Sequence, residues 1–298
     1  MAIETLSPRD VTGTLSYFAG KDAYYYVGEP PAGVPRSNIE ENLRPYEVTI
    51  HDTRGKEDAF SLDTTGFAFV RLPSEEREFK DEEAIRGGYY KEIEELLKAQ
   101  TGAKRVFVFD HTVRRPPTPE SLADKSYRGP SVGISVTCRS EVGVITYCLH
   151  LQRWVHGDQT TQAAIHRVYD HMGADADRLI KGRWRIINVW RPIENPVAHD
   201  PLVLGDWRTL NTATDIAPMR LIYPHKVGGT LTVRYSAAHR FHYLSGQTPD
   251  EVTLIKCFDS QDGVARLAPH TSFKDKTSPS DAPQRQSIEV RALVFDLE

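Results

Sequence analysis

A histidine and an aspartate in the middle of the chain have the spacing of a metal-binding pair. Of eleven histidines, only His156 stands two residues before a carboxylate, that of Asp158, in the segment WVHGDQT. At a turn or a strand end this spacing puts both side chains on the same side of the backbone, where they can bind one metal ion. Because about one such pair arises by chance in a chain of this composition, a metal site needs a third ligand.

A histidine far downstream would complete a triad of two histidines and one carboxylate. Such a triad holds Fe(II) on one face and leaves positions open for a chelating cosubstrate and O2. His270, in ARLAPHTSF, follows a strand-like run and is the favoured third ligand. His239 and His242, in SAAHRFHY, lie in the same β-rich half of the chain and remain the alternatives.

An arginine soon after the distal histidine would suit a 2-oxoglutarate site, because a guanidinium binds a carboxylate through two parallel hydrogen bonds. Arg285 and Arg291 both follow His270, in RQSIEVRALVF. Being six residues apart, they can face the same side of one strand. We favour Arg285 as the arginine that binds 2-oxoglutarate, and Arg291 remains the alternative.

Other polar residues stand near these segments. His111 and Arg114 end the run FVFDHTVR and could contact substrate, although ordinary strand-end hydrogen bonds are equally expected there. Asn188, Trp190 and Arg191, in INVWRP, could line a pocket, with a core position favoured for Trp190.

Several other kinds of chemistry have no support in the sequence. There is no GxGxxG after a strand and no GxxxxGK[ST], which disfavours dehydrogenases and P-loop proteins. The three cysteines, Cys138, Cys148 and Cys257, have no CxxC spacing, so neither a disulfide framework nor a cysteine zinc site is indicated. A reducing compartment fits this pattern best.

Composition and charge indicate which classes of binding partner the protein can have. The 298 residues include 37 basic and 41 acidic ones, a formal charge of -4, and no basic stripe that would follow a phosphate backbone. No segment approaches the roughly 18 apolar residues of a membrane span, and the N-terminus has no signal-like run. We therefore expect a cytoplasmic protein that acts on a small molecule, with no nucleic-acid or membrane partner.

The first part of the chain predicts an irregular arm followed by short elements. Residues 1–48 are rich in Pro, Gly, Tyr and Asn and show no sustained period. Clustered β-branched and aromatic residues predict strands at 46–53 and 66–72. Helical spacing predicts a helix over 81–100 that ends at Gly102, and alternation then predicts a strand over 104–114.

The later part becomes β-rich. A helical pattern over 160–182 is interrupted at Gly173, with Asp175 able to cap a second helix. Short β-like runs follow at 185–191, 230–235, 251–258, 263–268 and 286–295. Since no linker divides the chain, we predict one domain over 1–298, mainly β with flanking helices (α+β), arranged as a sandwich or barrel.

Six segments in order resemble a known family: FVFDHTVR, WVHGDQT, INVWRP, HRFHYLSGQTPDEVTLIKCFDS, ARLAPHTSF and RQSIEVRALVF. They look like the fungal and bacterial hydroxylase/desaturase family, which includes gibberellin desaturase-like proteins and the small subunit of cephem 7α-methoxylase. The resemblance covers about residue 10 to the C-terminus. It implies a double-stranded β-helix (a cupin-like jelly roll) and Fe(II)/2-oxoglutarate-dependent oxidation with O2, usually of specialised metabolites.

Matching the motifs supports His156 and Asp158 from HxD and His270 from PHT as iron ligands, and less directly Arg285 as the 2-oxoglutarate arginine. The reaction would be hydroxylation, desaturation or oxidative cyclisation. Two alternatives stay open: a catalytically silent accessory subunit of a biosynthetic enzyme, and a cupin-like metalloenzyme independent of 2-oxoglutarate. A homodimer or a partner biosynthetic enzyme is compatible with either.

One segment departs from the family pattern. Relatives are expected to reach the HxD motif soon after Gly129-Pro130, whereas residues 131–153 intervene here. The segment is either an extra hairpin or translated non-coding sequence. Standing just before two predicted ligands, it could displace them.

Overall fold

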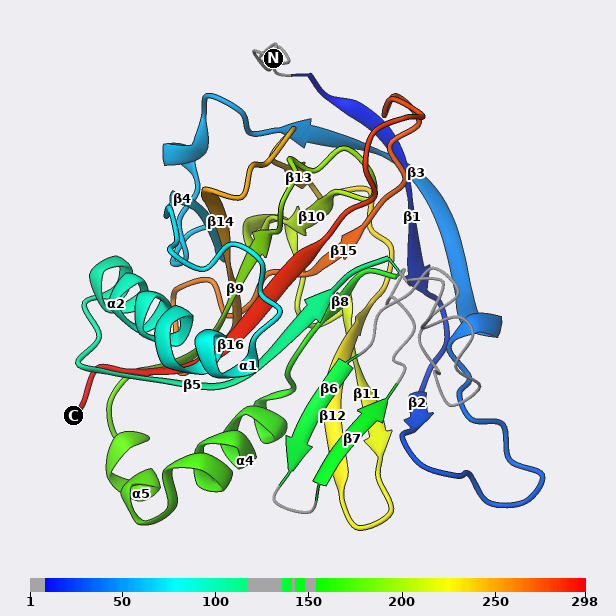
Figure 1. Ribbon diagram of the computed structural model, residues 1–298. Helices are drawn as coiled ribbons and strands as arrows, with labels where there is room; N and C mark the ends of the chain where they lie inside the picture. The colour runs from blue at the N-terminus through cyan, green and yellow to red at the C-terminus, as the bar shows by residue number, and fades with distance from the viewer. Residues whose placement is uncertain (1–8, 117–135, 141–142, 148–153) are drawn as a thin grey trace.

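Most strands of the protein belong to two β-sheets (Figure 1). The computed structural model describes residues 9–116, 136–140, 143–147 and 154–298. Phe67, Trp190 and Leu293 of one sheet pack in the same buried cluster as Leu204 of the other. The space between the sheets is therefore the place where residues from distant parts of the chain come together.

The larger sheet has nine strands, in the order β1-β3-β13-β10-β15-β8-β12-β11-β2. Its neighbours are antiparallel except for β13 with β3 and β11 with β2, which are parallel. The strands are β1 Val11–Phe18, β2 Ala23–Tyr26, β3 Leu43–Asp52, β8 His156–Gly157, β10 Leu202–Gly205, β11 Ile216–Ile222, β12 Val227–Val233, β13 Phe241–Tyr243 and β15 His270–Ser272.

The smaller sheet has five antiparallel strands, in the order β4-β14-β9-β16-β5. Side chains alternate between its faces: along β16, Ile288 and Val290 turn to the outer cluster, whereas Leu293 and Phe295 turn inward. The strands are β4 Phe67–Arg71, β5 Arg105–Arg114, β9 Trp184–Pro192, β14 Glu251–Asp259 and β16 Ser287–Phe295.

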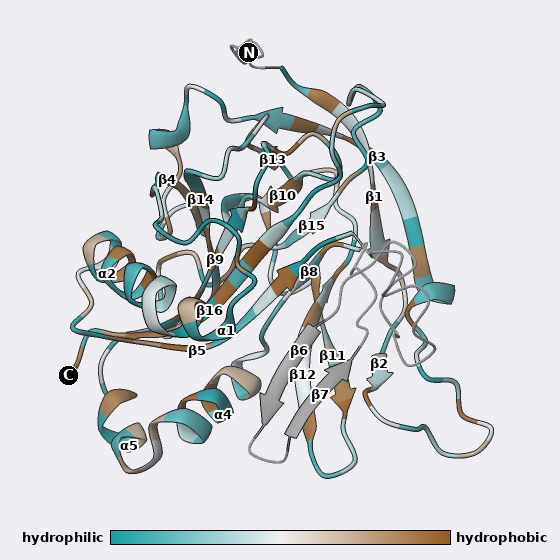
Figure 2. Cartoon of the chain, viewed as in Figure 1, coloured by the Kyte–Doolittle hydropathy of each residue, from teal (hydrophilic) through white to brown (hydrophobic). Residues whose placement is uncertain are grey.

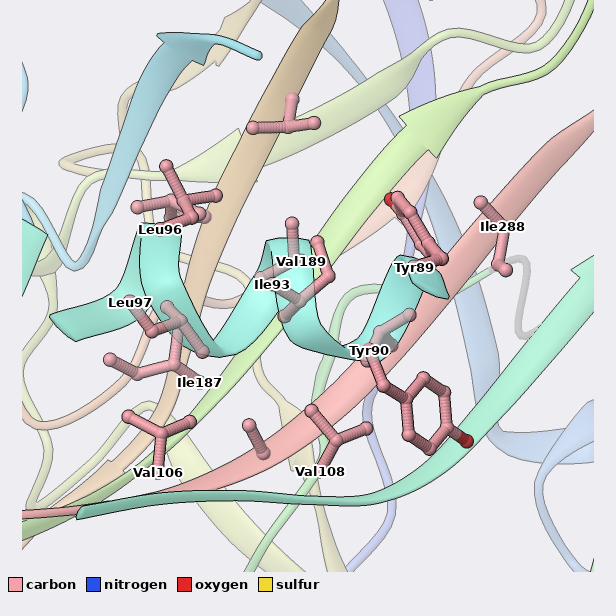
Figure 3. Close-up of a cluster of buried hydrophobic side chains, with 14 of the residues drawn as sticks. Tyr89, Tyr90, Ile93, Leu96, Leu97, Val106, Val108, Ile187, Val189 and Ile288 are labelled. Atoms are coloured by element: carbon pink, nitrogen blue, oxygen red, sulfur yellow. The ribbon is translucent and has the colours of Figure 1, made fainter. Parts of the chain in front are cut away.

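Helices cover the outer face of the smaller sheet. The predicted helix over 81–100 is confirmed as α1 (Glu82–Ala84), a π-helical turn (Ile85–Tyr89) and α2 (Tyr90–Thr101), which ends at Gly102 with a φ of 70°. Helix α2 carries both hydrophilic and hydrophobic residues (Figure 2). Its apolar side chains pack on the sheet together with residues of β5, β9 and β16 (Figure 3), among them Ile93, Leu97, Val106, Val108, Ile187, Val189 and Ile288.

A second helical stretch lies directly after the HxD segment. Helix α4 (Thr161–Met172) begins with the Thr160 hydroxyl accepting from the Ala163 amide, and α5 (Ala176–Leu179) follows it. The expected break at Gly173 is present. Asp175 precedes α5, but its side chain accepts no hydrogen bond from a backbone amide of that helix. Its carboxylate accepts instead from Arg105 of β5 and from Arg178 of α5.

Two other expectations were wrong in part. Within the predicted irregular arm 1–48, residues 11–18 and 23–26 form β1 and β2 at opposite edges of the nine-stranded sheet. Val11, Leu15 and Tyr17 alternate with polar residues and are buried in the structure. This alternation is the strand signal in the sequence, and the composition of the arm obscured it. Conversely, residues 263–268 form no strand, although Ala265 and Leu267 are buried.

The backbone of the segment before the HxD motif forms an antiparallel hairpin of β6 (Val136–Ser140) and β7 (Gly143–Tyr147), separate from both large sheets. This is what the extra-hairpin alternative requires. The rest of 131–153 lies outside the described residues. Across the described chain, no helix has the length and apolar character needed to cross a membrane.

Candidate metal and cosubstrate site

Three predicted ligands come together on the inner face of the nine-stranded sheet. His156 on β8 and His270 on β15 are opposite each other in neighbouring antiparallel strands, and their ring centres lie 4.4 Å apart. Asp158 Oδ1 lies 3.6 Å from His156 Nε2 and 3.7 Å from His270 Nε2. One donor atom from each residue falls within 4.8 Å of the other two. The segment before β8 therefore does not displace the HxD residues.

Backbone carbonyls determine the tautomer and the orientation of both imidazole rings. His156 Nδ1 lies 2.9 Å from the carbonyl oxygen of Trp154, and His270 Nδ1 lies 3.0 Å from that of Ala268. A carbonyl only accepts, so each Nδ1 carries the proton and each Nε2 presents a lone pair toward Asp158. This is how metal-ligating histidines are usually oriented.

The charges at the site match a cation-binding role. Burial, and then the neighbouring His270, lower the pKa of His156 to about 3, so this imidazole is neutral at pH 7. Although burial opposes ionisation of Asp158, the adjacent His270 and His156 hold its pKa below the usual value. The site therefore combines a neutral imidazole with a carboxylate anion, the protonation states in which these groups bind metals.

A buried amide orients the Asp158 carboxylate from the opposite sheet. Asn188, on β9, donates from Nδ2 to Asp158 Oδ2 at 2.6 Å, and its side chain is fully buried. The Cys257 thiol of β14 lies 3.5 Å from the same oxygen. With Oδ2 occupied, Oδ1 faces the two histidines. The expectation that Asn188 lines the site holds, and Trp190 belongs to the buried core as favoured.

We expect Asn188→Ala to weaken metal binding about tenfold, because partners that orient a ligand usually contribute 10- to 100-fold in affinity. Titration of the metal-free protein with Mn(II) measures the effect. Cys257→Ala is the matched control, since it removes a weak thiol contact to the same oxygen and should change affinity by less than about twofold. Equal affinities for wild type and Asn188→Ala would contradict the orienting role.

The two predicted arginines lie in different environments on β16 and just before it. Arg291 contacts Asp110 at 2.9 Å and Glu289 at 2.9 Å, so two carboxylates already engage it. Arg285 donates to the backbone carbonyl of Asp200 and lies 5.9 Å from the centre of the Trp190 ring. Arg285 thus has no carboxylate partner among the described residues.

The alternative distal histidines lie elsewhere. His239 contacts Asp215 at 3.0 Å, and its ring stacks on Tyr17 of β1. His242, on β13, packs against Phe60, and burial lowers its pKa to about 4. Neither belongs to the His-Asp-His group.

One polar residue was missed from the sequence. Ser287 begins β16, is fully buried, and has a hydroxyl without a hydrogen-bond partner among the described residues. It stands two residues after Arg285, which places both side chains on one face of an extended chain. The spacing Arg-Gln-Ser was the signal available in the sequence.

Two histidines and one carboxylate, held between two β-sheets, form a group that could hold one metal ion, in the combination that non-haem Fe(II) oxygenases use. The donor set suits Fe(II): among the described residues, the group offers two imidazole nitrogens and one carboxylate oxygen and includes no cysteine.

Comparison with known proteins gives the family. A family model described as oxidoreductase/YMDC permease-like domain matches residues 15–295. The Fe(II)/2-oxoglutarate-dependent dioxygenase nvfI of Aspergillus novofumigatus is 33% identical over 282 residues, covering 92% of this chain and 91% of the relative. The hydroxylase/desaturase CTB9 of Cercospora beticola is 37% identical over 270 residues, covering 85% and 78%.

A solved structure agrees. The iron and alpha-ketoglutarate-dependent endoperoxidase NvfI superposes with a TM-score of 0.77 at 30% identity, covering 96% of this chain and 98% of that one. The chain therefore belongs to the family of fungal Fe(II)/2-oxoglutarate-dependent dioxygenases and hydroxylase/desaturases. The predicted enzyme class, with Fe(II), 2-oxoglutarate and O2, is confirmed.

Proposed function

We propose that His156, Asp158 and His270 bind Fe(II) in an enzyme that oxidises a small specialised metabolite. The observation that carries the proposal is the convergence of their three donor atoms within 4.8 Å. Two facing sheets with the ligands on their inner side support a double-stranded β-helix as the architecture, formed by one domain over 1–298 with 131–153 as an insertion.

The 2-oxoglutarate arginine in this proposal is Arg285. Arg291 is held by Asp110 and Glu289, whereas the partners of Arg285 within the described part of the chain are a carbonyl and a ring. The unpartnered hydroxyl of Ser287 adds a donor on the same face. A guanidinium and a hydroxyl together bind a carboxylate through charge-assisted hydrogen bonds.

When bound, Fe(II) with 2-oxoglutarate and O2 supplies an oxidant strong enough for an unactivated C–H bond, with succinate and CO2 as coproducts. The chain's own residues do the rest. The two backbone carbonyls hold the imidazoles as Nδ1–H tautomers, Asn188 fixes the Asp158 carboxylate, and Arg285 with Ser287 orients the cosubstrate. Hydroxylation, desaturation and oxidative ring closure are all outcomes of this arrangement.

The proposed function includes a small-molecule substrate and a cytoplasmic location. A small molecule suits a site enclosed between two sheets, and the buried free thiol of Cys257 is compatible with the cytoplasm. A homodimer or a partner biosynthetic enzyme stays a prediction. Oligomeric state in solution, measured by light scattering, tests the former.

Anaerobic titration with Fe(II) and 2-oxoglutarate tests the proposal. We expect a weak visible charge-transfer band, and O2-dependent succinate formation when air is admitted. Arg285→Gln should raise the 2-oxoglutarate concentration needed for half of the band by about 10- to 100-fold, since a charged hydrogen bond contributes about 1.5–3 kcal/mol.

Other outcomes would contradict it. A well-folded, metal-loaded protein without the band would not be a 2-oxoglutarate enzyme. Turnover that continues in both Arg285→Gln and Arg291→Gln would favour a metalloenzyme independent of 2-oxoglutarate. Succinate formed only after adding a second protein would favour the accessory-subunit alternative.

A further inference from the structure

A third arginine, Arg114, faces the same inner space as Arg285. Arg114 ends β5 and is directly opposite Ser287 in the antiparallel pairing of β5 with β16. The neighbouring pair lies on the other face, because Arg115 donates to the Gln286 side chain and to the backbone carbonyl of Glu78. Since faces alternate along a strand, Arg114 and Ser287 point inward, and Arg285 points inward beside them.

Their spacing brings the two guanidiniums to one place. Arg285 stands two residues before Ser287, which is the partner of Arg114 across the two strands, and long side chains can reach over a diagonal of this kind. The electrostatic effects agree, because Arg114 lowers the pKa of Arg285 after burial has already done so. Arg114 therefore lies near enough to Arg285 to influence its charge.

Nothing in the described residues neutralises these two cations by direct contact. Arg114 makes no hydrogen bond or ion pair there; the acidic side chains that affect it, Glu289 and Asp158, act at longer range. Glu289 is already engaged by Arg291, and Asp158 by Asn188 and the two histidines. Two partly buried like charges without a contacting counterion are unfavourable, and the arrangement is relieved when an anion binds between them.

We propose that Arg114 is a second arginine for the distal carboxylate of 2-oxoglutarate, completing a cradle of Arg114, Arg285 and Ser287. The inference rests on the proposed function above and adds a residue from a different strand to it. Two guanidiniums and one hydroxyl can donate to both oxygens of one carboxylate. A 2-oxo acid without the distal carboxylate would gain nothing from Arg114.

Binding of 2-oxoglutarate to the Mn(II)-loaded protein, which does not turn over, tests this by calorimetry. Arg114→Gln should weaken 2-oxoglutarate binding about 10- to 100-fold and change 2-oxobutyrate binding by less than about twofold. Arg114→Lys should lie between wild type and Arg114→Gln, because a lysine keeps the charge but not the two-pronged geometry. Arg115→Gln, one residue along on the other face, is the matched control and should bind 2-oxoglutarate as wild type does.

Thermal unfolding of the metal-free protein separates binding from structure. Arg114→Gln should melt at the wild-type temperature or higher, since it removes one of two like charges, and 2-oxoglutarate with Mn(II) should stabilise it less. A lower melting temperature with unchanged 2-oxoglutarate affinity would make Arg114 structural and overturn the inference. Equal losses for 2-oxoglutarate and 2-oxobutyrate would also overturn it. If wild type itself fails to bind 2-oxoglutarate, the proposed function fails instead.

Discussion

Replacing His270 by alanine is expected to abolish succinate formation and the visible band with Fe(II) and 2-oxoglutarate. The substitution removes one of three donors, and its effect should exceed the 10- to 100-fold typical of a residue that only orients a ligand. The backbone of β15 keeps its pairing with β8 and β10, so the protein should remain folded. Metal titration and succinate quantification measure the result.

His242→Gln provides the comparison within the same sheet. His242 lies on β13 among aromatic rings and outside the triad, so this variant should keep the band. If His242→Gln lost the band and His270→Ala kept it, the distal ligand would be wrongly assigned. Circular dichroism on both variants excludes unfolding as the cause.

The second large effect concerns stability. Lys256 and Asp259 are both fully buried and contact each other at 2.6 Å, and Arg183 contacts Asp259 at 2.6 Å. Asp63 contacts both cations from the partly exposed side. Asp259→Asn leaves the two cations without their buried carboxylate and should cost about 3–5 kcal/mol in the free energy of unfolding.

Urea unfolding at pH 7 measures this cost. Asp262→Asn, three positions further along, is the control: its side chain is 96% exposed and pairs with Arg266, so the substitution should lower the free energy of unfolding by less than about 1 kcal/mol. Similar destabilisation in both variants would show that the buried network contributes no more than a surface ion pair.

The same buried ion-pair network should make the stability of the protein depend on pH in the acid range. Burial would raise the pKa of Asp63, but Arg183 and Lys256 outweigh it and lower that pKa to about 2; the same two cations lower the pKa of Asp259. Carboxyls with lowered pKa values stabilise the fold above their unfolded pKa of about 3.9 and lose that contribution as pH falls. Wild type should therefore lose stability between about pH 4 and pH 2, and Asp259→Asn should lose less over that range.

Sequence reasoning selected the three residues that lie together in the structure because their signal is local. His156 and Asp158 were found by their spacing, and His270 by its place after an apolar run. The choice between Arg285 and Arg291 was not local, because it depends on Asp110 of β5 and on Glu289 occupying Arg291. No periodicity shows which strand lies beside β16.

The same limit applies to the fold. Strands such as 185–191 and 286–295 were predicted because β-branched and other apolar residues cluster in them, whereas β1 was missed because its alternation lies within a polar, Pro- and Gly-rich stretch. Residues 263–268 failed in the opposite way: Ala265 and Ala268 are buried, yet their amides bond to Asp63 and Lys256 singly and not as a ladder. Burial alone does not make a strand.

The position of β8 also determines when the site can form. Both of its neighbours, β12 and β15, come later in the chain, and His270 follows the HxD motif by over a third of the sequence. During synthesis His156 and Asp158 therefore emerge before the strand partners of β8, and long-range pairing of this kind forms slowly. In the proposed site, iron would load only after the C-terminal half has folded, and a truncated chain would carry the HxD motif without His270.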